Sequence, residues 1–350
     1  MSDLAAPVAS HTAFTELPVV DVSALVDAAS TPGQRKAAAD ALGRAARDVG
    51  FLYITGHGIA GQVIDDLKAQ TAAYFAQPLD RKMRDYIGNS VNHSGYVPEG
   101  EEQPNPDSVD LKEAYDVGYD LQDSRLQRPM LGPNQWPELA GFREAISCYY
   151  HAALNLGNAL FRGFALALGL EEERFLRQVN HPPSQLRLIH YPFNPRMSAD
   201  RPGIGAHTDY ECFTILLPTA PGLEVLNGAG KWIDVPLLEN AFVINIGDML
   251  EALSNGAFAA TSHRVRKVAQ ERYSFPLFCS MDYDTLIEPL PEFVNDAQPP
   301  RYPRLVAGEH LYAQTIQTFA YLKKRLAEGR ISLPEGSRGV GSFGKYGGAP

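Results

Sequence analysis

The sequence predicts a mainly β fold with flanking helices, and three observations support this prediction. Six short apolar segments between residues 186 and 280 are separated by Gly, Pro and Asn turns, which is typical of an antiparallel sandwich or barrel. The first half of the chain instead contains segments with helical periodicity. With 350 residues, 45% of them hydrophobic, the chain can bury a substantial core as one large or two modest domains.

The N-terminal elements follow from local signals. An apolar run with an early proline predicts a short edge strand, and an Ala-rich run that opens with Thr31-Pro32 and stops at Gly50 predicts a helix. A β-branched and aromatic run between glycines predicts the next strand. In order, we expect a strand at 17–22, a helix at 31–49, a strand at 51–55, and helices at about 60–76 and 139–168.

Residues 77–135 show no sustained periodicity. So long an irregular stretch in a compact domain is more often a functional lid or binding loop than a simple connection. We therefore treat 17–135 as an N-terminal region that ends in a substrate lid. The side chains in this stretch that could face a substrate are Tyr96, Glu101, Glu102, Tyr115 and Tyr119.

After a short helix expected at 171–178, the second half of the chain consists mainly of segments typical of β-strands. The expected strands are 186–191, 213–217, 223–226, 241–246, 263–268 and 273–280. A core at 183–285 is followed by a C-terminal part, 286–350, with one helix at about 308–327 and a Gly-rich tail.

Composition argues against several classes of protein. The net charge of −10 would repel nucleic acid and anionic membranes. Three cysteines without metal-type spacing do not indicate a disulfide framework, which favours a reducing compartment. The N-terminus has no basic segment followed by an apolar one, and no run approaches the roughly 18 apolar residues of a membrane span. We expect a cytoplasmic protein that binds neither nucleic acid nor membrane.

The strongest chemical signal is the stretch Gly205-Ala206-His207-Thr208-Asp209-Tyr210. In an extended strand His207 and Asp209 project to the same side, which places one imidazole and one carboxylate together. A second imidazole, His263, follows 54 positions after Asp209. Two histidines and one carboxylate form a facial triad that holds Fe(II) and leaves three positions open, an arrangement typical of a catalytic site.

Motifs around these residues occur in a recognisable order. Within 30 residues the chain reads Asn245-Ile246-Gly247-Asp248, Ser254-Asn255-Gly256, Thr261-Ser262-His263-Arg264-Val265 and Arg272-Tyr273-Ser274. With the Leu-Pro-Val-Val-Asp opening at Leu17 and the motif Gly50-Phe51-Leu52-Tyr53-Ile54, the sequence resembles the isopenicillin-N-synthase-like family of non-haem iron, mostly 2-oxoglutarate-dependent, dioxygenases. The resemblance implies a double-stranded β-helix, or distorted jelly roll, with the iron inside and held by His207, Asp209 and His263.

A second pair of residues matches a carboxylate ligand. Arg272 and Ser274 are two apart in an expected strand and share a face, so a guanidinium and a hydroxyl lie side by side. The resemblance implies that they bind the distal carboxylate of 2-oxoglutarate and that Tyr191 contacts the oxo-acid or the substrate. Arg187 could meet a substrate carboxylate, or it could be a buried structural arginine paired with an acid.

The expected activity is oxidation of a small metabolite at a C–H bond by O2, Fe(II) and 2-oxoglutarate, by hydroxylation, desaturation or cyclisation, with release of succinate and CO2. Alternatives are an oxidase of the isopenicillin N synthase kind that uses no oxo-acid, an ethylene-forming enzyme, and a catalytically silent jelly-roll binding protein. Glu211-Cys212-Phe213 and Cys279-Ser280-Met281-Asp282 depart from the commoner plant pattern near the expected pocket wall and suggest a microbial specialised-metabolism branch. Phe213, with Tyr96, Tyr115 and Arg187, is expected to contact the substrate. Relatives of this family are often monomeric, and we expect a monomer.

Overall fold

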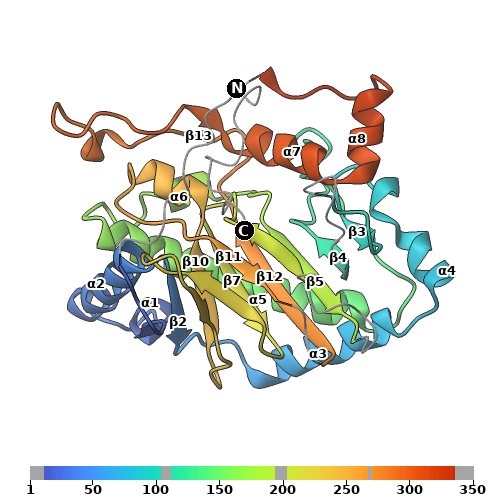
Figure 1. Ribbon diagram of the computed structural model, residues 1–350, viewed down its shortest axis with the longest axis horizontal. Helices are drawn as coiled ribbons and strands as arrows, with labels where there is room; N and C mark the ends of the chain where they lie inside the picture. Colours follow the sequence, from blue (N-terminus) through green and yellow to red (C-terminus); the bar gives the residue numbers. More distant parts are fainter. Residues whose placement is uncertain (1–11, 104–111, 194–202, 267–269, 336–350) are drawn as a thin grey trace.

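Two sheets organise the protein in a computed structural model that describes residues 12–103, 112–193, 203–266 and 270–335. The large sheet has the strand order β1-β2-β10-β7-β12-β5-β4-β3, and the smaller one has the order β6-β11-β8-β9 (Figure 1). Except for the parallel β1–β2 pair, neighbouring strands in both sheets are antiparallel. The predicted mainly β, antiparallel fold is therefore confirmed.

The strands of the large sheet are β1 Val19–Asp21, β2 Phe51–Thr55, β3 Gly95–Val97, β4 Glu113–Val117, β5 Gln185–Tyr191, β7 Phe213–Pro218, β10 Phe242–Ile246 and β12 Arg272–Cys279. Those of the smaller sheet are β6 Ile204–His207, β8 Leu223–Leu226, β9 Trp232–Asp234 and β11 His263–Val265. A separate pair comprises β13 Leu286–Ile287 and β14 Leu305–Val306. A hydrophobic cluster that joins β2, β7 and β10 to β8 lies between the two sheets.

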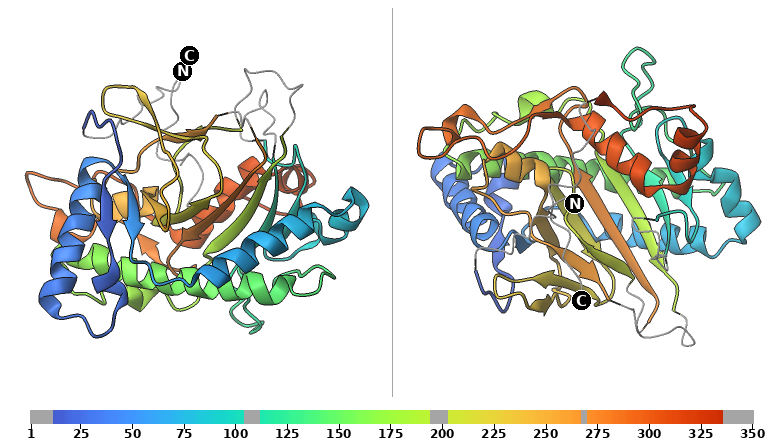
Figure 2. Two further views of the ribbon diagram at one scale, coloured as in Figure 1. Left: turned by 90° about the horizontal axis from the view of Figure 1, so that it is seen from below. Right: turned by 45° about the horizontal axis from the view of Figure 1, so that its top comes forward.

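Helices from the first half of the chain cover the other face of the large sheet. The helices are α1 Ser23–Val26, α2 Pro32–Asp48, α3 Gly61–Phe75, α4 Leu79–Lys82, α5 Phe142–Ala167, α6 Asp248–Leu253, α7 Ala307–Thr318 and α8 Ala320–Ala327. The long α5 packs against α2, α3 and β12, and Figure 2 shows α3 and α5 lying together beneath the sheet. None of the helices in the described ranges is long and apolar enough to cross a membrane.

Local sequence explains where α2 begins and ends. Thr31 accepts a hydrogen bond from the Gln34 backbone and the Gln34 side chain accepts one from the Thr31 backbone, which forms a capping box ahead of Pro32. Gly50 follows the helix with φ of +74°, a conformation that favours glycine. A Cβ there would also come within 2.1 Å of the Ala259 oxygen, so the chain can turn into β2 only with glycine at this position.

The structure differs from the sequence-based expectations in several elements. The stretch expected to be an irregular lid contributes β3 and β4, which pair with each other and extend the large sheet from β5. Residues 171–178 contain only the short 3-10 helix Leu176–Gln178, and the single C-terminal helix is divided in two at the extended residue Phe319. Strand β6 ends at His207, so Asp209 lies outside it. Parts of the expected lid (104–111), strand (267–268) and tail (336–350) lie outside the described residues.

Candidate active site

Three side chains converge where β6 and β11 pair. His207 ends β6, His263 begins β11, and the two residues are direct partners across the antiparallel ladder. Their Nε2 atoms each lie 3.6 Å from Oδ1 of Asp209, and the two imidazole centroids are 4.2 Å apart. One ligand atom from each residue lies within 4.8 Å of the others. The cluster has the residue types and spacing to hold one metal ion.

Hydrogen bonds orient each member of this triad. A backbone carbonyl can only accept, so the contact between His207 Nδ1 and the Gly205 oxygen (2.8 Å) places the proton on Nδ1 and leaves the Nε2 lone pair for a metal. Asp209 Oδ2 accepts hydrogen bonds from Asn245 Nδ2 (2.6 Å) and from the Thr214 hydroxyl. Oδ1 is thereby left facing the two imidazoles, as expected of a carboxylate that binds a metal through one oxygen.

Electrostatics favour the protonation states that a metal requires. Burial disfavours the charged form of Asp209, but the nearby His263 and His207 and the hydrogen bonds from Thr214 and Asn245 together lower its pKa. Burial, with the repulsion of a charged His207, lowers the pKa of His263 to about 4. At neutral pH the cluster therefore offers a carboxylate and a neutral imidazole, both of which are ready to bind a cation.

The turn that carries Asp209 is held by the start of α6. The backbone N–H groups of Gly247, Asp248 and Met249 donate to the oxygens of Cys212 (2.9 Å), Asp209 (2.9 Å) and Glu211 (3.2 Å). A Cβ on Gly247 would lie 2.1 Å from the Glu211 oxygen and 3.1 Å from the Asp209 oxygen. Only glycine allows this approach, which explains the Gly in the Asn-Ile-Gly-Asp motif. Asp209 thus reaches the histidines from a turn rather than from the strand predicted for it.

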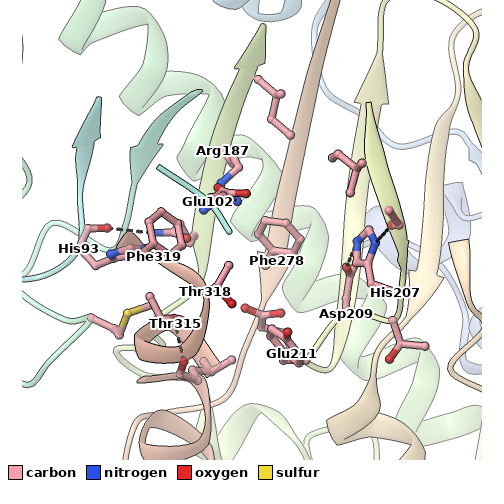
Figure 3. A pocket seen from close by; sticks show the side chains of 18 of the residues that line it. His93, Glu102, Arg187, His207, Asp209, Glu211, Phe278, Thr315, Thr318 and Phe319 are labelled. Carbon is pink, nitrogen blue, oxygen red and sulfur yellow. Dashed lines mark hydrogen bonds and ion pairs between the residues drawn. The ribbon is translucent and has the colours of Figure 1, made fainter. Parts of the chain in front are cut away.

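A cavity of about 440 Å³ opens beside the triad (Figure 3). One wall is the chain from Ile204 to Glu211, which includes His207 and Asp209; another comes from β5 and β12; and a third comes from the C-terminal helical segment. The described residues that line it outside the triad stretch are His93, Glu102, Lys112, Met130, Gln185, Arg187, Ile189, Phe278, Leu311, Thr315, Thr318 and Phe319. The cavity therefore combines apolar walls with a few polar groups, as small-molecule sites do.

Arg272 lies further along the face of β12 that carries Phe278. It is 1% exposed, its Nε donates to the Ala220 oxygen (3.1 Å), and its guanidinium lies 4.7 Å from the centre of the Tyr191 ring. Its Nη1 is buried and has no hydrogen-bond partner within the described part of the chain. A buried guanidinium nitrogen without a partner, with the Ser274 hydroxyl on the same strand face, fits a carboxylate ligand. None of Arg272, Ser274 and Tyr191 is among the described residues that line the cavity.

Arg187 is paired with acids and also lines the cavity. Its Nε and Nη2 each lie 2.8 Å from an oxygen of Asp116, and Nη1 lies 2.6 Å from Glu102 Oε1. Lys112 Nζ lies 2.5 Å from the other Glu102 oxygen. Of the two interpretations offered for Arg187, the acid-paired structural arginine is the one whose partners are present.

Three residues expected to contact the substrate are placed elsewhere. Tyr96 and Tyr115 are buried in the main core, where the Tyr96 hydroxyl bonds to Glu113 (2.5 Å) and the Tyr115 hydroxyl to the Gln135 oxygen (2.9 Å). The Phe213 ring packs on α5, 4.7 Å from the ring of Phe161. None of the three is among the described cavity residues. All three side chains lie on the helix-covered face of the sheet, against α3 and α5.

Sequence reasoning missed the wall formed by the C-terminal segment and the position of Glu211. Leu311, Thr315 and Thr318 recur at helical spacing and so share one face of α7, a signal that the sequence contains but that does not say which site the face meets. Glu211 follows Asp209 by two residues. The sequence shows that it departs from the commoner plant pattern, but it does not show that its side chain lines the cavity. Burial and the charge of Asp209 raise the pKa of Glu211 to about 8.

Two family models match the chain. One, described as the 2OG-Fe(II) oxygenase superfamily, matches residues 182–281, and the other, described as the N-terminal region of the non-haem dioxygenase in morphine synthesis, matches residues 17–139. Homoarginine-6-hydroxylase from Arabidopsis thaliana is 32% identical over 335 residues, with 88% of this chain and 99% of the relative covered. A 2-oxoglutarate-Fe(II) type oxidoreductase from Emericella nidulans is 32% identical over 299 residues, which cover 80% and 85% of the two chains.

Solved structures agree with the fold. A 2OG-Fe(II) oxygenase family protein from Caulobacter crescentus superposes with a TM-score of 0.75 at 31% identity, with 90% of this chain and 99% of that chain covered. A full-length Neurospora crassa protein, solved in complex with alpha-KG, has a TM-score of 0.75 at 24% identity, with 91% and 100% covered. The jelly-roll class expected from the sequence is thereby confirmed.

Proposed function

Because this chain belongs to the 2OG-Fe(II) oxygenase superfamily, we propose that His207, Asp209 and His263 hold its iron. The chain is an Fe(II)- and 2-oxoglutarate-dependent oxygenase that acts on a small metabolite. The observation that carries the assignment of these residues is the convergence of two Nε2 atoms and one carboxylate oxygen within 4.8 Å of one another. This donor set suits Fe(II) and leaves positions open for further ligands.

Bound iron and 2-oxoglutarate would supply, together with O2, the oxidising power for reaction at an unreactive C–H bond, while the protein positions the reactants and excludes water. Thr214 and Asn245 hold Asp209 in one orientation, and the Gly205 carbonyl does the same for His207. These contacts fix the ligands before the metal arrives, so little reorganisation accompanies binding.

Arg272 and Ser274 bind the distal carboxylate of 2-oxoglutarate in this proposal. The support is the buried Nη1 without a partner in the described ranges, since a guanidinium and a hydroxyl on one strand face match two carboxylate oxygens. Tyr191 pairs with Arg272 across the β5–β12 ladder and its ring lies on the guanidinium, which supports a positioning role for Tyr191.

The cavity in front of the triad receives the substrate. Its volume of about 440 Å³ suits a small metabolite, and its wall of Ile189, Phe278 and Phe319 excludes water from the reacting centre. The Arabidopsis relative is named for homoarginine, so basic amino acids are the first substrates to screen. The monomeric state and the cytoplasmic location remain predictions.

An anaerobic titration of the Fe(II)-loaded enzyme with 2-oxoglutarate tests the cosubstrate site. A weak visible charge-transfer band of the oxo-acid on iron should appear, and Arg272→Ala should lose it at the same oxo-acid concentration. Arg264→Ala serves as the matched control. It removes a partly exposed guanidinium of the smaller sheet, which is paired with Glu224 of the same sheet. A band of full strength in Arg272→Ala would contradict the assignment of the anchor.

The metal assignment is tested by Asp209→Ala. Removing the central carboxylate should abolish Fe(II) binding and turnover, because two imidazoles alone cannot form the facial triad. Iron content after loading and succinate release report the two properties separately. A variant that keeps iron and full turnover would show that the metal lies elsewhere.

A further inference from the structure

Glu211 differs from the other acids that line the cavity. Asp209 is hydrogen-bonded to Thr214 and Asn245, and Glu102 is paired with Arg187 and Lys112. Glu211 also lines the cavity, and its carboxyl points into it (Figure 3). Its carboxyl accepts a hydrogen bond from its own backbone N–H, and no side chain in the described ranges forms an ion pair with it. Among the described residues, the cavity therefore contains one carboxyl that the protein itself does not pair.

The cationic side chains of the cavity are already engaged. Arg187 directs Nε and Nη2 to Asp116 and Nη1 to Glu102, so each end of its planar group faces a carboxylate. Lys112 is paired with Glu102 through Nζ. Neither cation is available to neutralise Glu211 or to attract a substrate carboxylate without breaking a buried ion pair, which is strongly unfavourable.

On the wall formed by α7, two threonine hydroxyls can act only as hydrogen-bond acceptors toward a ligand. Thr315 Oγ1 donates its hydrogen to the Leu311 oxygen (2.8 Å), and Thr318 Oγ1 donates to the Gln314 oxygen (2.9 Å). A hydroxyl has one hydrogen to donate, so each of these oxygens can offer only lone pairs to a ligand in the cavity. Together with Glu211, these hydroxyls make this side of the cavity rich in hydrogen-bond acceptors. A ligand with several N–H donors would complement it.

We propose that Glu211 determines substrate specificity and that the substrate carries a protonated nitrogen group, a guanidinium or an ammonium, which Glu211 binds. The inference rests on the proposed function, since it takes this cavity as the substrate site. A bound cation favours the ionised form of the Glu211 carboxyl, and its several N–H donors satisfy that carboxylate together with Thr315 and Thr318. The Phe278 ring, which lines the same cavity, offers such a cation an aromatic face.

Matched probes that differ only in charge test the proposal. Calorimetric titration of the anaerobic Fe(II)–2-oxoglutarate enzyme would compare n-butylguanidine with n-butylurea, and L-arginine with L-citrulline. Each pair has the same shape, and only the first member carries a guanidinium. A charge-assisted pair predicts that the guanidinium compound binds about 10- to 100-fold more tightly. Glu211→Gln should abolish this preference, and Glu211→Asp should retain part of it.

Glu288→Gln, which alters an exposed acid near Arg304, is the control and should keep the preference intact. The charge-transfer band of 2-oxoglutarate on iron distinguishes a failure of the proposed function from a failure of the role proposed for Glu211. Absence of the band in the wild-type enzyme would contradict the proposed function itself. With the band present, the inference is overturned if no cation binds, if the neutral members bind as tightly, or if Glu211→Gln keeps the preference.

Discussion

The chemistry proposed for the candidate site admits few substitutes at each position. An imidazole–carboxylate–imidazole set and an arginine beside a serine each match one kind of ligand, so His207, Asp209, His263 and Arg272 stand out by type and spacing. The partners of Arg187 could not be predicted, because Asp116 and Glu102 come from segments whose pairing depends on the folded sheet. Residue type indicates chemistry, whereas the partner of a buried charge depends on tertiary structure.

Thr214→Val tests how far the hydroxyl that bonds to Asp209 tunes the metal site. The variant keeps the shape of the side chain but removes one of the two donors to Oδ2, so the carboxylate is less firmly oriented. We expect Fe(II) affinity to fall about 10- to 100-fold, measured by competition with a chelator. Thr71→Val is the control, since its buried hydroxyl in α3 has no hydrogen-bond partner among the described residues. Equal iron affinity in both variants would exclude the orienting role.

Glu102 should make stability depend on acidity. Burial disfavours its charged form, but Arg187 and Lys112 outweigh this and lower the pKa of Glu102 to about 2 from an ordinary 4.5. Because the folded-state pKa is the lower one, its contribution to stability is complete above about pH 4.5 and is lost as pH falls toward 2. Urea unfolding from pH 6 to pH 3 should show a shallower loss of stability in Glu102→Gln than in the wild type. An identical slope would contradict this.

Elements set by local signals matched the predictions, and elements set by distant pairing did not. The strands β2 and β8 have the predicted bounds, and the capping box and Gly50 delimit α2 as expected. In contrast, β3 is only three residues long and gains its strand character from pairing with β4, which in turn pairs with β5. Such strands carry little periodicity of their own, which explains why the sequence alone predicts a lid in this stretch.

Gly247→Ala tests the junction between β10 and α6. The added Cβ would press on the backbone oxygens of Glu211 and Asp209, so the turn that carries the carboxylate must move. We expect weaker Fe(II) binding and a lower melting temperature, measured by chelator competition and by circular dichroism. Gly33→Ala is the control, because a Cβ there meets nothing within 4 Å. That helical substitution should stabilise the protein by about 0.4–1 kcal/mol.

Thr31→Ala tests the capping box that begins α2. Loss of the side-chain acceptor for the Gln34 N–H should lower the unfolding free energy by about 1 kcal/mol. Iron affinity should remain unchanged, because α2 lies on the helix-covered side of the large sheet. Denaturant unfolding gives the first quantity, and loss of iron binding at unchanged stability would contradict this separation.

At the scale of the molecule, Arg187 joins parts of the chain that are distant in sequence. Its partners are Asp116 on β4 and Glu102, whose backbone bridges to Phe319 between α7 and α8. Arg187→Met leaves the buried Asp116 without its cation and removes one of the two cations paired with Glu102, so it should destabilise the fold by about 3–5 kcal/mol, measured by chemical unfolding. Arg125→Met, which breaks an exposed pair with Asp123, should be nearly neutral. Equal losses in the two variants would show that the buried network is not important.

The candidate iron ligands and the proposed oxo-acid anchor belong to different sheets. His207 and His263 lie on β6 and β11 of the smaller sheet, whereas Arg272 and Ser274 lie on β12 of the large one. A cosubstrate held by both sets ties the layers together, so its binding free energy adds to the resistance of the whole sandwich to unfolding. At 100 times its Kd this addition is about 2.7 kcal/mol. The supply of 2-oxoglutarate would then govern the lifetime of the enzyme against proteolysis as well as its turnover.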